Sequence, residues 1–295
     1  MTKVAAKFAR MPKDPIVTRM LGRTGRTPTI FGLGGEGVLR TFGYERQASD
    51  VIHAALDEGV TYFDSARAYA GSEQYYGLAL GSTRERIFLT SKAHDRTRRG
   101  ALAMLDQTLA NMHTDHLDLW QLHDIRTWDE LDAIGAPGGA YEAFVEAKRA
   151  GKTRFIGVTG HHDPRVLLTA LERFSFDTVL LPANPCEAQS EPFVNVVGQR
   201  AKELGMGVIV MKVLSRGLLM ALDDAPSLQE LFDYALSQPA DVAIIGCDNV
   251  AHVEANAEAA RRFTPMSPQR QRELENRLSA HAARMLYYRP TALHS

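Results

Sequence analysis

Short apolar runs alternate along this chain with longer segments that carry apolar residues at helical spacing. The short runs are rich in β-branched and aromatic residues, as is typical of buried parallel strands. They predict strands at residues 30–35, 60–64, 86–91, 117–122, 154–159, 178–181, 207–211 and 242–245. Helices are predicted at residues 46–58, 72–80, 98–112, 139–150, 164–173, 192–204, 227–237 and 249–262. This regular alternation predicts an α/β fold in which eight βα units close into a single (β/α)8 barrel, or TIM barrel.

Two further elements flank the repeated units. Residues 20–30 have short apolar ends around glycine-containing turn residues, which predicts an N-terminal β-hairpin. Residues 269–285 predict an extra C-terminal helix. We therefore expect one domain over residues 17–295, preceded by a basic, flexible leader at residues 1–16.

Composition narrows the class of protein. The chain is 45% hydrophobic and 23% charged, as in ordinary soluble globular proteins. Its formal net charge of -1 provides no global basic field for nucleic acid, and no apolar run approaches the roughly 18 residues of a membrane helix. The two cysteines, Cys186 and Cys247, are far apart and lack metal-ligand spacing, so a reducing compartment fits. We expect a cytoplasmic protein without nucleic-acid or membrane partners.

Ionisable residues lie at or just after the ends of three successive predicted strands. Asp64 and Tyr69 follow one strand, Lys92 the next, and His123 the third. Barrel enzymes keep their chemistry at these strand ends, so the four side chains are expected to meet. A nearby ammonium group favours the phenolate, so Lys92 should lower the pKa of Tyr69. Asp64 would keep Lys92 protonated, and His123 would bind the same substrate oxygen. The four residues predict a proton donor for a carbonyl that receives hydride.

The segments around these residues resemble the aldo-keto reductases. The resemblance is carried by residues 63–66, 71–73, 90–92 and 118–123, and extends from residue 21 to about residue 256. It implies a TIM barrel without a Rossmann domain that uses a nicotinamide cofactor to reduce an aldehyde or ketone to an alcohol, or catalyses the reverse. The catalytic residues that it implies are Asp64, Tyr69, Lys92 and His123.

The resemblance also implies where the nicotinamide and the pyrophosphate bind. Thr159 matches a residue that holds the carboxamide, whereas Gly160 stands where the family usually has Asn, and His161 is a substitute partner. Asn184 is the candidate in place of a Gln after the sixth strand. The segment after the seventh strand is expected to contact the nicotinamide and wrap the pyrophosphate, through Met211, Lys212, Leu214, Arg216 and Gly217.

The adenosine end of the cofactor is expected near the eighth strand, at Gly246, Cys247, Asn249, His252 and Asn256. NADPH-preferring members commonly have Lys and Arg on this stretch to pair the 2′-phosphate. Gly246 and His252 occupy the matching places here, and a neutral His is a weaker partner of a phosphate than Arg. Asp248 would repel that phosphate. NADP(H), the common choice of the family, and NAD(H) both remain open.

Two other functions compete with carbonyl reduction. His123-Asp124 and His161-His162 lie at neighbouring strand ends and predict zinc or manganese ligands for a barrel hydrolase or isomerase. That hypothesis gives Asp64, Tyr69 and Lys92 no role, and it would make the protein metal-dependent instead of metal-free. A nucleotide-sensing subunit without catalysis is the second alternative, because a fold does not fix a function. The residues identify neither the small carbonyl substrate nor the oligomeric state.

Overall fold

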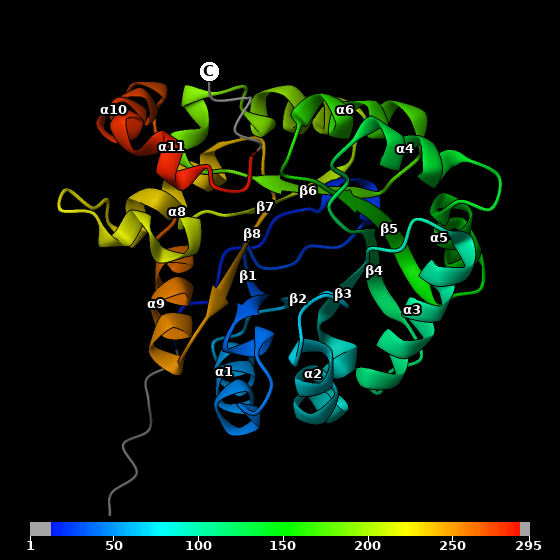
Figure 1. The fold of residues 1–295 in the computed structure, drawn as a ribbon. Helices are drawn as coiled ribbons and strands as arrows, with labels where there is room; N and C mark the ends of the chain where they lie inside the picture. Colours follow the sequence, from blue (N-terminus) through cyan, green and yellow to red (C-terminus); the bar gives the residue numbers. More distant parts are fainter. Residues whose placement is uncertain (1–12, 290–295) are drawn as a thin grey trace, which may run out of the picture.

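Eight parallel strands close into a barrel with helices around its outside (Figure 1). The structure is a computed structural model, and it describes residues 13–289 of the chain. Each strand pairs with the next in the sequence, and the last pairs with the first, so the predicted (β/α)8 barrel is confirmed. The strands are β1 (Phe31–Gly37), β2 (Tyr62–Asp64), β3 (Phe88–Ala93), β4 (Leu117–Leu122), β5 (Thr153–Thr159), β6 (Thr178–Pro182), β7 (Gly207–Met211) and β8 (Val242–Cys247).

The helices occupy the predicted positions, with local signals at their ends. Asp163 caps α6 by accepting from the amide of Arg165, and Ser227 forms a capping box with Glu230 at the start of α8. The helices are α1 (Glu45–Asp57), α2 (Ser72–Leu80), α3 (Arg98–Asn111), α4 (Trp128–Gly135), α5 (Ala140–Arg149), α6 (Pro164–Arg173), α7 (Gln199–Glu203), α8 (Leu228–Ser237), α9 (Val250–Arg261), α10 (Pro268–Leu278) and α11 (Ala282–Met285).

Three segments differ from the prediction. Residues 125–138, for which no helix was predicted, contain α4, whose Thr127 cap accepts a hydrogen bond from the amide of Glu130. The helix expected at residues 192–204 begins as a π-helix, Val194–Gly198, and only its end, α7, is α-helical. The C-terminal helix is present but is interrupted by a 3-10 turn at Ser279–His281, which separates α10 from α11.

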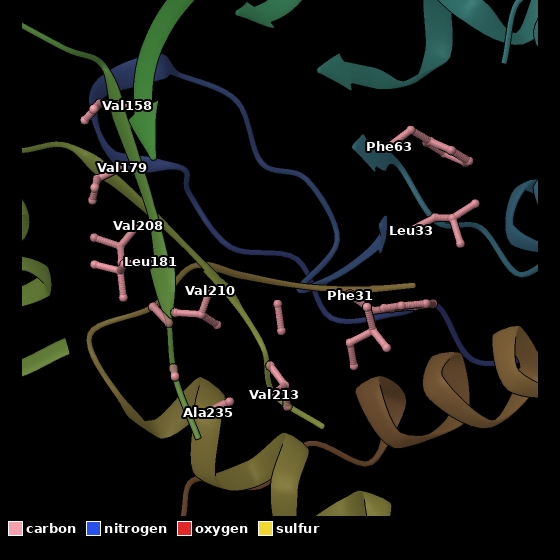
Figure 2. Close-up of a cluster of buried hydrophobic side chains, with 14 of the residues drawn as sticks. Phe31, Leu33, Phe63, Val158, Val179, Leu181, Val208, Val210, Val213 and Ala235 are labelled. Atoms are coloured by element: carbon pink, nitrogen blue, oxygen red, sulfur yellow. The ribbon is translucent and has the colours of Figure 1, made fainter. Parts of the chain in front are cut away.

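Successive residues of the strands face two different cores. Val179, Leu181, Val208 and Val210 lie together on one side of β6 and β7 and pack in the layer between strands and helices (Figure 2). The residues between them, Leu180 and Ile209, belong to a smaller cluster that fills the barrel interior. This alternation follows from the two-residue period of a strand. The interior cluster comprises Leu21, Tyr62, Phe88, Leu119, Leu180, Ile209, Val242 and Ile244.

The N-terminal hairpin closes one end of the barrel. Thr18 and Thr29 form an antiparallel bridge, and the fully buried Leu21 at the turn joins the interior cluster. Of the predicted leader, residues 1–12 lie outside the described part of the chain. Its last residues contact the barrel: Lys13 pairs with Glu58, and Ile16 is buried. No helix within residues 13–289 has both the length and the apolar character required to cross a bilayer.

Candidate active site

A cavity of about 660 Å³ opens where the strands end. Its walls come from the C-terminal ends of five strands, from the loops that follow them, and from the tail after α11. It contains three of the four residues predicted to be catalytic, and the fourth, Asp64, lies beneath it. The lining residues are Glu36, Arg40, Ala68, Tyr69, Lys92, His94, Arg96, His123, Asp124, Arg126, Glu130, Thr159, His161, His162, Leu180, Met211, Lys212, Arg216, Tyr287 and Tyr288.

Asp64 and Lys92 form a fully buried ion pair at the base of this cavity. Lys92 Nζ lies 2.5 Å from Asp64 Oδ2 and 2.7 Å from the carbonyl oxygen of Ser65. Thr90 donates to the other carboxylate oxygen of Asp64 at 2.8 Å. Burial raises the pKa of Asp64, whereas Lys92 and Thr90 act in the opposite direction. Because both carboxylate oxygens accept hydrogen bonds, the contacts suit an ionised Asp64 that holds the ammonium group in place.

Tyr69 lies between this ion pair and His123. The Lys92 ammonium nitrogen is 5.0 Å from the centroid of the Tyr69 ring. The ring of His123 meets that of Tyr69 edge to face, with centroids 5.8 Å apart. The four side chains that the sequence places at three different strand ends are therefore brought together.

The pKa of Tyr69 moves opposite to the sequence-based expectation. Burial raises it well above its usual range, and the negative charges of Asp64 and Glu36 raise it further. Arg40, whose guanidinium carbon lies 5.3 Å from the ring centroid, is the cation that opposes this shift. Lys92 is not among the main causes of this shift, and its nearest anion is Asp64, 2.5 Å from Nζ. The phenol therefore keeps its proton at neutral pH, which is the state that a proton donor requires.

His123 is uncharged at neutral pH. Burial lowers its pKa well below the usual range, and the positive charge of Lys92 lowers it further. Its backbone is fixed by Arg96, which donates to the carbonyl oxygens of His123 at 2.9 Å and of Asp124 at 2.8 Å. A neutral imidazole can donate one hydrogen bond to a substrate oxygen without competing with Tyr69 as an acid.

Asp124 and His161, proposed above as metal ligands, are engaged with protein groups. Asp124 accepts from Arg126 Nε at 2.6 Å, and its other carboxylate oxygen lies 3.3 Å from His161 Nε2. Burial lowers the pKa of His161 to about 4. Within residues 13–289 no three His, Cys, Asp or Glu side chains are grouped so that they could hold a metal ion.

Two of the residues predicted to bind the carboxamide, Thr159 and Asn184, form hydrogen bonds to other groups of the protein. Thr159 lines the cavity, but its hydroxyl oxygen accepts from the amide of Asp124 at 2.7 Å. Asn184 is buried and lies outside the cavity wall, where its side chain donates to the hydroxyl of Tyr288 at 3.1 Å. Gly160 sits close to the backbone of Ile125, which a Cβ atom would approach to 3.2 Å. His161 also lines the cavity, and its Nδ1 is buried without a hydrogen-bond partner.

The loop after β7 carries two cations into the cavity in an unusual backbone conformation. Lys212 and Arg216 have φ angles of 60° and 57°, in the left-handed region that non-glycine residues rarely adopt. Such strain tends to be concentrated at functional sites. Arg216 Nη2 lies 3.6 Å from Glu36 Oε1, and burial lowers the pKa of Lys212 while Glu36 opposes that shift. Met211 lines the same wall, whereas Leu214 and Gly217 are not among the residues that line the cavity.

The residues predicted to bind adenosine lie near the start of α9, away from the cavity wall. Asn249 caps this helix by accepting from the amide of His252 at 3.0 Å, and Asn256 donates to the buried thiol of Cys247 at 3.4 Å. His252 is exposed and lies 3.6 Å from Asp248. Gly246 packs so closely against Glu36 that a Cβ atom would lie 2.8 Å from its carbonyl carbon.

Several cavity residues were not singled out from the sequence. Glu36 lies near the end of β1 and Arg40 in the turn that follows it, and no motif marks either residue. Tyr287 and Tyr288 return from the C-terminal tail to the cavity, where Tyr288 donates to the buried Glu187. Arg289 pairs with the same carboxylate and anchors this tail. The dense aromatic and basic run at residues 287–289 was the available signal.

Comparisons with known proteins identify the family and agree with the fold. A model described as Aldo/keto reductase family matches residues 30–227. An uncharacterized oxidoreductase of Bacillus subtilis (strain 168) is 29% identical over 231 residues, which cover 68% of this chain and 67% of the relative. A solved aldo-keto reductase of Bacillus halodurans, in its holo form, is 22% identical with a TM-score of 0.73, over 89% of this chain and 96% of that one. An aldo-keto reductase of Klebsiella pneumoniae, solved in complex with NADPH, is 19% identical with a TM-score of 0.70, over 91% of this chain and 96% of that one.

Proposed function

Because the chain belongs to the aldo/keto reductase family, we propose that it is an NAD(P)H-dependent oxidoreductase that reduces an aldehyde or ketone, with Tyr69 as the proton donor. The observation that carries the proposal is the arrangement of Tyr69 between the buried Asp64–Lys92 pair and the neutral His123, in one cavity. A carbonyl needs both an orienting donor and an acid at its oxygen, and this wall of the cavity supplies both.

Each of the four residues has a distinct task. Tyr69 gives its hydroxyl proton to the carbonyl oxygen, and its raised pKa keeps that proton available at neutral pH. His123 donates a hydrogen bond to the same oxygen and orients the carbonyl against the phenol. Lys92 and Asp64 fix the position of Tyr69 from below, and the Lys92 charge favours the phenolate that forms as the proton leaves.

The cofactor is proposed to be NADP(H) or NAD(H), and when bound it supplies the hydride that the carbonyl carbon accepts. The Klebsiella structure in complex with NADPH supports a nicotinamide dinucleotide. Residues of this chain fit such a molecule at two places. Lys212 and Arg216 offer cations for the pyrophosphate, and the unpartnered His161 Nδ1 is an acceptor for the carboxamide, in place of the missing Asn.

The substitution Tyr69→Phe tests the proposal. It removes the proton donor but keeps the ring against His123 and Lys92. We expect NADPH to bind with unchanged affinity in a fluorescence titration, while kcat falls about 10²–10⁴-fold, the usual contribution of general acid catalysis. An equal loss of NADPH binding would contradict this assignment. Tyr44→Phe, which alters an exposed tyrosine, is the matched control.

Titration with NADPH and NADH, combined with activity assays, distinguishes a reductase from the two alternative functions. Tight binding of NADPH or NADH with no turnover of any carbonyl would favour a nucleotide-sensing subunit. Binding of neither cofactor, with activity that depends on added zinc or manganese, would favour the metal-dependent hydrolase or isomerase.

A further inference from the structure

Arg40 lies directly over the residue proposed as the proton donor. It ends a 3-10 turn, Val38–Arg40, that follows β1, and its guanidinium carbon is 5.3 Å from the Tyr69 ring centroid. Nη1 donates to Glu36 Oε1 at 2.6 Å, and this is the hydrogen bond that its guanidinium makes within residues 13–289. The side chain is 44% exposed and lines the cavity. The remaining N–H groups of Arg40 are therefore open to a ligand beside Tyr69.

The acidic residues of the cavity leave positive charge in excess around Glu36. Asp124 is bound to Arg126, and Glu130 is bound to Arg96. Glu36 is the acidic residue that faces Arg40, Lys212 and Arg216. Burial acts to raise the pKa of Glu36, and these three cations lower it.

These three cations differ in their position. Lys212 and Arg216 follow β7, on the side of a barrel where phosphate groups commonly bind. Arg40 instead comes from the loop after β1 and stacks on Tyr69, where the reacting carbonyl must lie. A planar guanidinium with free N–H groups is suited to a carboxylate or a phosphate.

We propose that Arg40 determines substrate specificity, and that the substrate is a carbonyl compound with a second, anionic group, a carboxylate or a phosphate, that Arg40 binds. This rests on the proposed function, because it assigns the substrate class of the same site. Arg40 holds the anionic group on the open side of Tyr69 while the carbonyl oxygen lies between Tyr69 and His123.

The test compares charged and neutral carbonyls in wild type and Arg40→Gln with NADPH. The carboxylate pair is 4-carboxybenzaldehyde and methyl 4-formylbenzoate, and the phosphate pair is D-glyceraldehyde 3-phosphate and D-glyceraldehyde. Charge-assisted hydrogen bonds suggest that Arg40→Gln lowers kcat/KM for the charged member of the preferred pair about 10- to 100-fold. We expect the change mainly in KM, and a change below about threefold for the neutral member. The pair that shows the preference identifies the anion.

Two variants serve as controls. Arg40→Lys keeps the charge but loses the planar donors, and should restore part of the preference. Arg262→Gln removes one positive charge at an exposed position after α9 and should leave the preference unchanged. If Arg40→Gln slows both members of each pair equally, Arg40 only positions Tyr69, and the proposal fails. It also fails if Arg40→Gln weakens NADPH binding and leaves the preference for the charged carbonyl intact.

A binding experiment separates this proposal from the proposed function. Titration calorimetry with 4-(hydroxymethyl)benzoate, its methyl ester and D-glycerol 3-phosphate requires no turnover. Binding of one of the anions by wild type, lost in Arg40→Gln, would support the anion site even if no carbonyl were reduced. Absence of binding to both anions, together with equal turnover of charged and neutral carbonyls or none at all, would overturn it.

Discussion

Lys92 and Asp64 form an ion pair that is almost completely buried at the base of the cavity, with Nζ 2.5 Å from Oδ2 and each side chain 1% exposed. Such a pair adds little stability compared with well-packed apolar residues, but breaking it leaves one charge buried alone. Its position beneath Tyr69 explains why a cationic and an anionic side chain are both placed in the wall of a barrel.

Asp64→Asn should therefore cost about 3–5 kcal/mol of unfolding free energy, because it leaves the Lys92 ammonium group without its counter-charge. Lys92→Met should cost a similar amount, because it leaves the Asp64 carboxylate buried without its counter-charge. The double substitution removes both charges, and we expect it to be more stable than the sum of the single effects predicts. Urea unfolding of the four proteins measures this coupling. Strict additivity would show that the two side chains do not depend on each other.

The stability of the protein should decrease in acid because of His161. Its pKa is about 4 in the folded protein and about 6.5 in an unfolded chain. As the pH falls below 6.5, the unfolded chain binds the proton first. Stability that is fully present above pH 6.5 is therefore lost progressively down to pH 4, by about 3 kcal/mol from this residue.

His161→Gln should flatten this dependence between pH 6.5 and 4, as measured by urea unfolding at intervals of pH. The substitution changes a side chain that faces Asp124, Arg126, Lys212 and His162. His53→Gln, at an exposed position of α1, controls for the loss of a histidine as such. An unchanged slope in His161→Gln would mean that other groups account for the acid sensitivity.

Gly37 places Glu36 and Arg40 correctly at the cavity. Its φ is 71°, and a Cβ atom there would lie 2.5 Å from the carbonyl oxygen of Cys247, where the pairing of β1 with β8 shifts register. Gly37→Ala should be strongly destabilising, because a φ of 71° with a ψ of -141° is a combination that essentially only glycine adopts, and overpacking commonly adds about 1–3 kcal/mol. Gly25→Ala has a similar φ of 68° but meets nothing within 4 Å. Thermal unfolding should therefore show a larger loss at residue 37, and equal losses would contradict the close contact.

The barrel and the four catalytic candidates were predictable because their signals are local. Apolar runs define the strands, and the strand ends bring Asp64, Lys92 and His123 to one face. The sequence also contains a signal for α4 that the prediction did not use: Thr127 and Glu130 have the spacing of a helix cap.

The electrostatics of the site was not predictable in the same way. The expected lowering of the Tyr69 pKa is wrong, because burial and the negative charges of Asp64 and Glu36 raise it. Arg40 acts on Tyr69 from a loop 29 positions earlier in the sequence. Asn184 donates a hydrogen bond to Tyr288, which belongs to the C-terminal tail. Such contacts depend on the packing of separate segments, which hydrophobic periodicity does not encode.

The start of α9 is predicted to bind the adenosine end of the cofactor, so substitutions there should change the choice between NADPH and NADH. Asp248 and His252 are exposed there, and a lysine at residue 246 would need the backbone of Glu36 to move. His252→Arg with Asp248→Asn should therefore strengthen NADPH binding about tenfold or more, through a charge-assisted contact with the 2′-phosphate and the loss of a repulsive charge. NADH affinity should change little, because NADH lacks that phosphate. Fluorescence titration with both cofactors measures the ratio, and Glu258→Gln, which removes a negative charge further along α9, is the control. A parallel gain for both cofactors would place the 2′-phosphate elsewhere.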